Sequence, residues 1–169
     1  MRTKYTVPLN TLANELNLEP LHLSSKYETT LLSMSEINRP ALQLAGFYNY
    51  FDPKRLQAIG KVETTYLETL SHEDRLKAFE QFMAYDIVGL VVCHGCRTFP
   101  ECLAMAEKYD RNVFQTEEDT SSFTARATFS LHNYLAPRLT MHGVLVDVYG
   151  EGLLLTGDSG IGKSETHCI

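Results

Sequence analysis

The chain has 169 residues, of which 44% are hydrophobic and 21% are charged, and its formal net charge is −6. These values are ordinary for a globular protein. Net acidity and scattered Lys and Arg argue against sequence-independent nucleic-acid binding, which needs a clustered basic face. The longest apolar run, Ile87 to Cys93, is far shorter than the about 20 residues that cross a bilayer. We therefore expect neither nucleic acid nor membrane as a partner.

The amino terminus shows no apolar segment typical of a secretory signal, and four cysteines are too few for a disulfide scaffold. A cytoplasmic location is therefore expected.

The first third of the chain is typical of a mixed α/β fold. Asn10 is a predicted cap for a short helix over Thr11 to Leu16. Short strands are predicted at Leu21–Leu23, Thr30–Leu32 and Arg55–Gly60. The aromatic stretch from Phe47 to Phe51 could stack on a ligand, but packing in a core or an interface is the favoured interpretation.

The middle of the chain has clearer periodicity. Ser71 precedes a helical pattern with Leu76, Phe79 and Met83 on one face. The apolar run Ile87 to Cys93 then predicts a strand buried on both faces. A second helix follows, with Thr98 as its predicted cap, Pro100 in its first turn and its end near Tyr109, and a strand is predicted at Asn112–Gln115. Strand, helix and strand in this order indicate a βαβ unit.

The longest predicted helix covers Asp119 to Ala136 and is stopped by Pro137. We place a domain boundary at its end, which gives an amino-terminal α/β domain over residues 1–136 and the start of a second domain over residues 137–169. Alternation in Gly143–Tyr149, a glycine-rich turn and the apolar Leu153–Thr156 predict a β-hairpin after this boundary.

The hairpin leads into the one motif that carries clear chemistry. The residues Gly157, Asp158, Ser159, Gly160, Ile161, Gly162, Lys163 and Ser164 match the Walker A pattern G-x-x-x-x-G-K-[ST]. Its glycines let several backbone N–H groups point at one phosphate, and the start of a helix adds a favourable dipole. Lys163 can reach the β and γ phosphates, and Ser164 can place its hydroxyl on Mg²⁺. A nucleotide phosphate is the expected ligand.

Two other groups of residues have competing interpretations. Cys93 and Cys96 form a C-x-x-C pattern, which could be a redox pair, but two buried or half-buried thiols are favoured. A zinc site would need a second pair of ligands, and the chain offers only Cys102, Cys168 and scattered histidines. His142 opens the hairpin, so antiparallel pairing could bring it near the phosphate site, although a lone histidine is more often structural.

Two blocks of sequence resemble the HPr kinase/phosphorylase family. The first runs from Met141 to Glu165, and the second includes Ile37 to Phe47, Tyr50, Phe51 and Arg55 to Gly60. The resemblance implies a small amino-terminal α/β domain similar to the first domain of Mur ligases. It also implies that the hairpin and the Walker A loop open a P-loop kinase domain, which is incomplete here.

The resemblance further implies a function. Members of the family phosphorylate a serine of the phosphocarrier protein HPr with ATP or pyrophosphate, and they remove that phosphate by phosphorolysis. They act in bacterial carbon catabolite repression, in the cytoplasm, and they form hexamers. Gly157 to Ser164 would bind the nucleotide or pyrophosphate, Lys163 would neutralise phosphoryl charge, and Ser164 would help to hold Mg²⁺. His142 matches the active-site histidine of the family.

The general base and the second metal-binding carboxylate of the family follow the P-loop, where this chain has only the residues from Glu165 to Ile169. We therefore expect a truncated chain that does not phosphorylate HPr by itself. The alternative function is a non-catalytic interaction or oligomerisation module that carries a vestigial P-loop.

Overall fold

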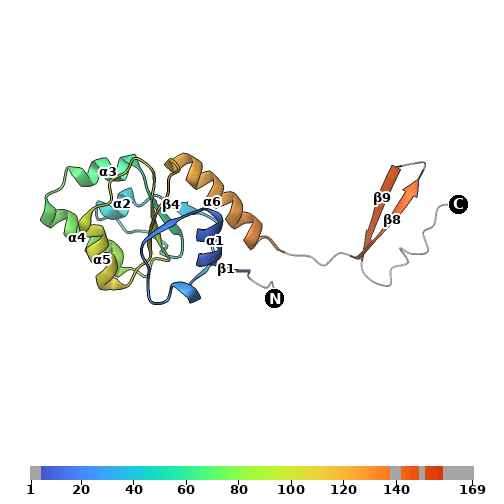
Figure 1. The fold of residues 1–169 in the computed structure, drawn as a ribbon, viewed down its shortest axis with the longest axis horizontal. Helices are drawn as coiled ribbons and strands as arrows, with labels where there is room; N and C mark the ends of the chain where they lie inside the picture. Colours follow the sequence, from blue (N-terminus) through green and yellow to red (C-terminus); the bar gives the residue numbers. More distant parts are fainter. Residues whose placement is uncertain (1–4, 138–141, 149–150, 158–169) are drawn as a thin grey trace. The chain divides into compact units, whose positions relative to one another are not determined.

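The computed structural model describes residues 5–137, 142–148 and 151–157. The chain divides into two compact units, Met1–Ala136 and Pro137–Ile169 (Figure 1). Each unit is considered by itself below. Within the described ranges, no helix combines the length and the apolar character that crossing a membrane requires.

A five-stranded mixed sheet forms the centre of the first unit, with the strand order β2-β7-β6-β5-β4. Strands β4 to β7 are parallel, and β2 pairs with β7 in the antiparallel direction at one edge. The strands are β2 (Glu19–His22), β4 (Ile37–Asn38), β5 (Leu56–Ile59), β6 (Leu90–Val92) and β7 (Val113–Gln115). The parallel strands therefore follow one another in space in the order of the sequence.

Helices cover both faces of this sheet (Figure 1). Residues of four helices share one hydrophobic cluster with Ile59, Leu90 and Val92. These helices are α2 (Ala41–Leu44), α3 (Lys61–Glu68), α4 (His72–Ala84) and α5 (Pro100–Tyr109). Residues of α1 (Leu9–Glu15) and α6 (Thr120–Leu135) share the other cluster, which includes Val91 and Phe114. The result is a three-layer α/β fold, so the predicted fold class is confirmed.

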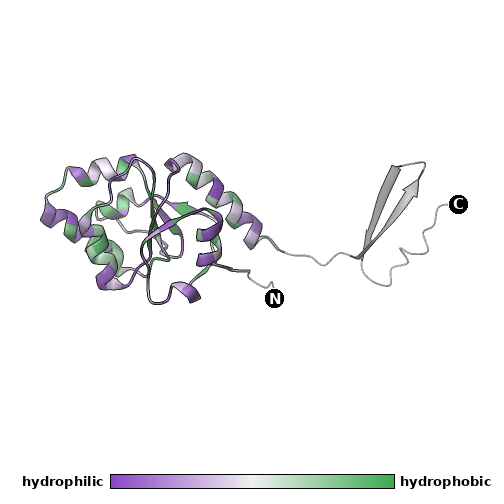
Figure 2. Ribbon diagram, viewed as in Figure 1, coloured by the Kyte–Doolittle hydropathy of each residue, from purple (hydrophilic) through white to green (hydrophobic). Residues whose placement is uncertain are grey.

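The two clusters alternate along the strands, because successive side chains of a strand point to opposite faces. Along β6, Leu90 and Val92 join one cluster and Val91 joins the other. All three residues are buried, so the prediction of a strand buried on both faces is confirmed, although the strand is shorter than the apolar run. Figure 2 shows the matching mixture of hydrophilic and hydrophobic residues along the helices.

The remaining elements of the first unit are short. Strand β1 (Val7–Pro8) pairs with β3 (Leu31–Leu32) in the antiparallel direction, and a 3-10 turn, η1, spans Tyr27–Thr29. The β6-α5-β7 segment forms the predicted parallel βαβ unit.

Two predicted helix caps are wrong. Helix α1 begins at Leu9, directly after Pro8, and Asn10 lies inside the helix, where its amide donates to Glu28 Oε2 at 3.0 Å. Helix α5 is preceded by Phe99 in extended conformation rather than by Thr98, because Pro100 occupies the first turn. Pro100 suits the first turn of α5, since its fixed φ is helical and its missing N–H needs no cap there, whereas Pro8 is the extended residue that directly precedes α1.

The other two long helices, α4 and α6, each begin with a side-chain cap. The Ser71 hydroxyl accepts a hydrogen bond from the Asp74 N–H at 3.1 Å, and Asp119 Oδ1 accepts one from Ser122 N at 2.8 Å. Each bond satisfies a backbone donor in the first helical turn, which has no partner within the helix.

Replacement of Ser71 with alanine should lower the free energy of unfolding by about 1 kcal/mol, because the Asp74 N–H loses its acceptor. Urea denaturation followed by circular dichroism measures this change. Ser121→Ala is the matched control, since Ser121 is an exposed serine inside α6, and its effect should stay within about 0.5 kcal/mol. Equal losses in both variants would contradict the capping role.

The second unit contains the predicted β-hairpin. Strands β8 (His142–Val148) and β9 (Glu151–Gly157) pair in the antiparallel direction over their whole length. The hairpin prediction is therefore confirmed. Strand β8 begins and ends one residue earlier than expected, and β9 is longer than expected at both ends. Asp158 to Ser164, which complete the Walker A motif, lie outside the described residues.

Candidate functional site

The hairpin register relates two residues singled out from the sequence. His142, the first residue of β8, is paired with Gly157, the last residue of β9, and Gly157 is the first residue of the Walker A motif. Directly paired residues of an antiparallel ladder have Cα atoms about 4.5–5.5 Å apart. The backbone of the histidine therefore lies opposite the point at which the chain enters the phosphate-binding sequence.

In the first unit, the carboxyl ends of β4 and β5 meet the start of α6 around an ion pair whose carboxylate is buried. The Arg39 guanidinium donates to both oxygens of Glu63, at 3.0 and 2.7 Å, and the Glu63 side chain is only 2% exposed. Glu63 Oε2 also accepts from the Gly60 N–H at 2.8 Å. A Cβ atom at Gly60 would lie 2.5 Å from both Arg39 Nη2 and Thr120 Oγ1, so a larger residue would displace these side chains.

The loop after β6 contains the C-x-x-C pattern. Burial raises the pKa of the Cys93 thiol to about 11, although a hydrogen bond from Thr120 acts in the opposite direction. The Cys93 thiol is therefore mostly protonated at neutral pH, which disfavours it as the thiol that attacks first. Within the described residues, no group of three or more His, Cys, Asp or Glu side chains could hold a metal ion. The described residues therefore give no support to a zinc site.

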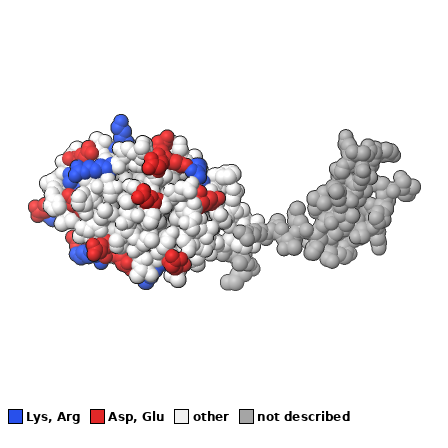
Figure 3. All heavy atoms as spheres, viewed as in Figure 1, with Lys and Arg blue, Asp and Glu red and all other residues white. Residues whose placement is uncertain are grey.

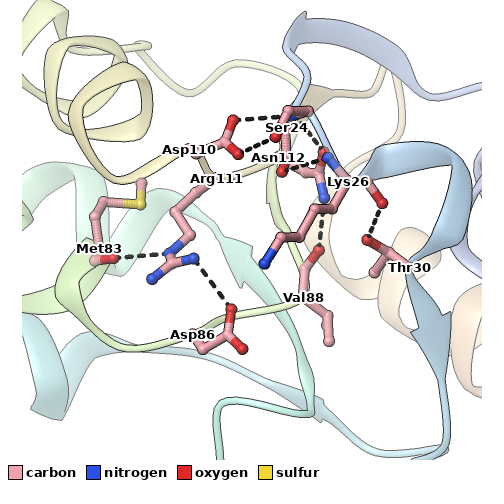
Figure 4. A network of polar contacts seen from close by, with 10 residues as sticks. Ser24, Lys26, Thr30, Met83, Asp86, Val88, Asp110, Arg111 and Asn112 are labelled. Atoms are coloured by element: carbon pink, nitrogen blue, oxygen red, sulfur yellow. Dashed lines mark hydrogen bonds and ion pairs between the residues drawn. The ribbon is translucent and has the colours of Figure 1, made fainter.

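A polar network lies at the amino ends of β6 and β7, as Figure 4 shows. Asn112, just before β7, accepts a hydrogen bond from Ser24 N at 2.8 Å and donates to the Val88 carbonyl at 3.1 Å. Arg111 donates to the Met83 carbonyl at 2.9 Å and to Asp86 at 3.0 Å. These bonds connect loops from three parts of the chain.

A cavity of about 410 Å³ adjoins this network and is lined by two basic and two acidic side chains, Lys26, Arg111, Asp86 and Asp110. Asp86 is paired with Arg111, and Asp110 accepts two hydrogen bonds from Ser25. Because the charges balance, the cavity favours no ligand of either sign. Acidic and basic side chains are also interspersed on the face shown in Figure 3.

The aromatic stretch divides into two parts. Tyr48 and Phe51 pack against the cluster beneath α4, and the Tyr48 ring stacks on Tyr85 with centroids 4.7 Å apart. Phe47 and Tyr50 are exposed. Packing in the core is thus confirmed for Tyr48 and Phe51, whereas Phe47 and Tyr50 lie outside the core.

The sequence interpretation missed the Arg39–Glu63 pair. The available signal was Glu63 three residues after Gly60, which is the spacing of a helix start whose acidic residue accepts from the preceding backbone. Its arginine partner lies 24 residues earlier in the chain, so local patterns do not indicate it.

Comparison with known proteins decides the family. Residues 7–131 match the family model described as HPr Serine kinase N terminus, and residues 133–168 match the HPr Serine kinase C-terminal domain. The chain belongs to the HPr serine kinase family. The change from one family model to the other falls within the last turns of α6.

Curated members of the HPr serine kinase family are similar over nearly the whole chain. The HPr kinase/phosphorylases of Alkaliphilus metalliredigens and Clostridium perfringens strain 13 are each 42% identical over 95% of it, and that of Clostridium beijerinckii is 44% identical over 92%. These alignments cover 52%, 52% and 51% of the relatives, respectively. The chain thus spans about half the length of the curated relatives it matches.

A solved structure resembles the fold. It contains the CBS and DRTGG domains of the regulatory region of Clostridium perfringens pyrophosphatase, complexed with the activator diadenosine tetraphosphate. The TM-score is 0.52 at 14% identity, over 76% of this chain and 50% of that chain. At this level of identity, the likeness concerns the fold alone. Similarity to the first domain of Mur ligases stays a prediction.

Proposed function

We propose that this chain provides the amino-terminal domain and the phosphate-binding loop of an enzyme that phosphorylates a serine of HPr. The same site would remove the phosphate by phosphorolysis. The enzyme would act in the cytoplasm, in carbon catabolite repression, on the HPr of the phosphotransferase system. The observation that carries the proposal is the hairpin register, which pairs His142 with Gly157 at the entry to a complete Walker A sequence. Homo-oligomerisation, as a hexamer, belongs to the same proposal.

The motif assigns a role to each residue of the loop. The backbone N–H groups from Gly157 to Gly162 would hold the phosphates of ATP or pyrophosphate. Lys163 would neutralise charge on the transferred phosphoryl group, and the Ser164 hydroxyl would be a ligand of Mg²⁺. His142 would act beside the reacting phosphate. Mg²⁺, when bound, would draw charge away from the phosphoryl oxygens.

A chimeric enzyme tests this proposal. Residues 1–165 of this chain are joined to the remaining half of the Clostridium perfringens relative, and transfer of labelled phosphate from ATP to HPr is measured. The chimera should label HPr on serine, and it should release pyrophosphate from phosphorylated HPr when inorganic phosphate is added. Lys163→Ala in the chimera should reduce transfer by on the order of 10²-fold or more, because the phosphate charge loses its cation.

The control is Lys61→Ala in the same chimera, since Lys61 is an exposed lysine at the start of α3 and distant in sequence from the loop. Its activity should equal that of the unchanged chimera. A chimera that is folded by circular dichroism but does not label HPr, while the parent relative does, would contradict the proposal. Self-association of that inactive chimera would then favour the non-catalytic interaction module.

A further inference from the structure

Cys93 and Cys96 lie at the two ends of a tight turn that follows β6. The Cys96 N–H donates to the Cys93 carbonyl at 3.1 Å, which closes a four-residue turn. Gly95 has φ of +77° and is the third residue of this turn, as a type II turn requires. The first and fourth Cα atoms of a β-turn lie less than about 7 Å apart, and disulfides span Cα distances of about 4.4–6.8 Å. The turn therefore presents the two cysteines at a spacing that a disulfide can bridge.

The two thiols differ in their access to solvent. Cys96 is only partly buried, whereas Cys93 is buried on the α6 side of the sheet. A cavity of about 170 Å³ opens beside the turn, lined by both cysteines and by His94, Gly95 and Glu117. A small reagent can thus approach Cys96 from solvent. The Cys96 side chain packs against the cluster of α2 to α5, whereas Cys93 belongs to the cluster of α1 and α6, so a bond between them requires the Cys96 side chain to rotate.

A positive charge lies near both thiols. The Arg39 guanidinium interacts electrostatically with Cys93 and with Cys96. The thiolate is the species that attacks a disulfide. Cys102, in α5, is also buried, and burial raises the pKa of its thiol to about 12, so it is a built-in unreactive comparison.

We propose that Cys93 and Cys96 form a reversible intramolecular disulfide, with Cys96 as the thiol that reacts first with a low-molecular-weight disulfide. The Cys96 thiolate attacks one sulfur of that disulfide, forms a mixed disulfide and releases one thiolate. Cys93 then loses its proton to solvent and attacks the Cys96 sulfur, which displaces the second thiolate. Both cysteines are oxidised, and the small disulfide is reduced to two thiols.

The disulfide would change the contacts at the start of α6. Thr120, the first residue of this helix, hydrogen-bonds to the Cys93 thiol, and its hydroxyl lies next to the junction of Arg39 and Gly60. A disulfide sulfur accepts hydrogen bonds less well than a thiolate or thiol, so oxidation weakens the contact between the β6 loop and α6. The site and its consequence are independent of the proposed kinase function.

Mass spectrometry of the full chain tests the proposal. The reduced chain is incubated with oxidised glutathione, alkylated under denaturing conditions and digested with trypsin. Cleavage after Lys77 and Arg97 places both cysteines in one peptide, whereas Cys102 and Cys168 fall in two others. The peptide from Ala78 to Arg97 should be unalkylated and lighter by two hydrogen atoms, and dithiothreitol should reverse the change. The Cys102 peptide should be fully alkylated.

The order of reaction is tested on the native, reduced chain. Brief alkylation should modify Cys96 at least about tenfold faster than Cys93 or Cys102, because Cys96 is partly exposed and the other two are buried. In Cys96→Ser, oxidised glutathione should leave Cys93 unmodified while the chain stays folded. A stable mixed disulfide at Cys96 without an internal bond, or faster reaction at Cys93, would overturn the proposal.

Discussion

Arg39→Leu should lower the free energy of unfolding by about 3–5 kcal/mol, because it leaves the buried Glu63 carboxylate without its cation. Glu63 would keep only the Gly60 N–H among the donors that now surround it. The leucine cannot replace the two parallel hydrogen bonds, which make an arginine–carboxylate pair directional as well as attractive. Urea denaturation followed by circular dichroism measures the loss.

The matched control is Glu63→Gln, which removes the charge of the other partner. Its cost should be clearly smaller, since the Arg39 side chain is 39% exposed and its charge can be solvated. The double variant should be more stable than Arg39→Leu alone, because no buried charge is left unpaired. If Arg39→Leu costs no more than Glu63→Gln, the stranded carboxylate is not the dominant effect.

Arg75→Met should lower the free energy of unfolding by a similar amount, about 3–5 kcal/mol, through a second buried carboxylate. The Arg75 guanidinium donates to Glu101 Oε1 at 3.1 Å and to the carbonyls of Leu67 and Leu70 at 2.9 and 3.0 Å. It also lies 4.6 Å from the centre of the Phe99 ring. Methionine keeps the contact with the ring and leaves three acceptors without this donor.

The same variant should change the pH dependence of stability. Burial alone raises the pKa of the Glu101 carboxyl, but hydrogen bonds from its own backbone, His72 and Arg75 outweigh burial and lower the pKa below its ordinary value. A lowered folded-state pKa means that the carboxylate stabilises the fold above the unfolded-state pKa of about 4.3. This stabilisation is lost as the pH falls through the folded-state value. Arg75→Met should therefore lose less stability between pH 5 and pH 3 than the unchanged protein does.

Arg97→Met is the matched control, because the Arg97 guanidinium lies 4.9 Å from the centre of the same Phe99 ring. It should retain the acid dependence of the unchanged protein and lose about 1 kcal/mol or less, as expected of a cation–π contact alone. An acid dependence that is the same in Arg75→Met and Arg97→Met would contradict the role of Arg75 at Glu101.

Local patterns were sufficient to predict the elements that have strong periodicity. The helix pattern with Phe79 and Met83 corresponds to α4, and the β6-α5-β7 segment follows from an apolar run, a proline start and a second short strand. Helix α3 was missed, because Lys61–Glu68 has few apolar residues and its start has no side-chain cap residue before it, only the glycine Gly60. Two predicted caps are wrong, because α1 begins directly after Pro8 and α5 begins at Pro100, and patterns of capping residues do not take these prolines into account.

The candidate site likewise has one part that local sequence patterns predict and another part that they do not. The Walker A spacing and the hairpin before it are local, so the sequence predicts them directly. The pairing of His142 with Gly157 requires the register of the hairpin, which depends on where its turn falls. The junction of Arg39, Glu63 and Thr120 joins segments separated by 24 or more residues, and only the fold brings them together.

The strand order of the sheet has a consequence for the order of folding. Strands β4 to β7 are adjacent in space in the order in which they are synthesised, so each can pair soon after it leaves the ribosome. Strand β2 is different, because Glu19 pairs with Gln115, and α1 packs against α6. Because the ribosome adds about 5–20 residues per second, several seconds pass between the synthesis of β2 and α1 and that of these partners. The earliest part of this domain to be made is thus among the last to complete its sheet and core contacts.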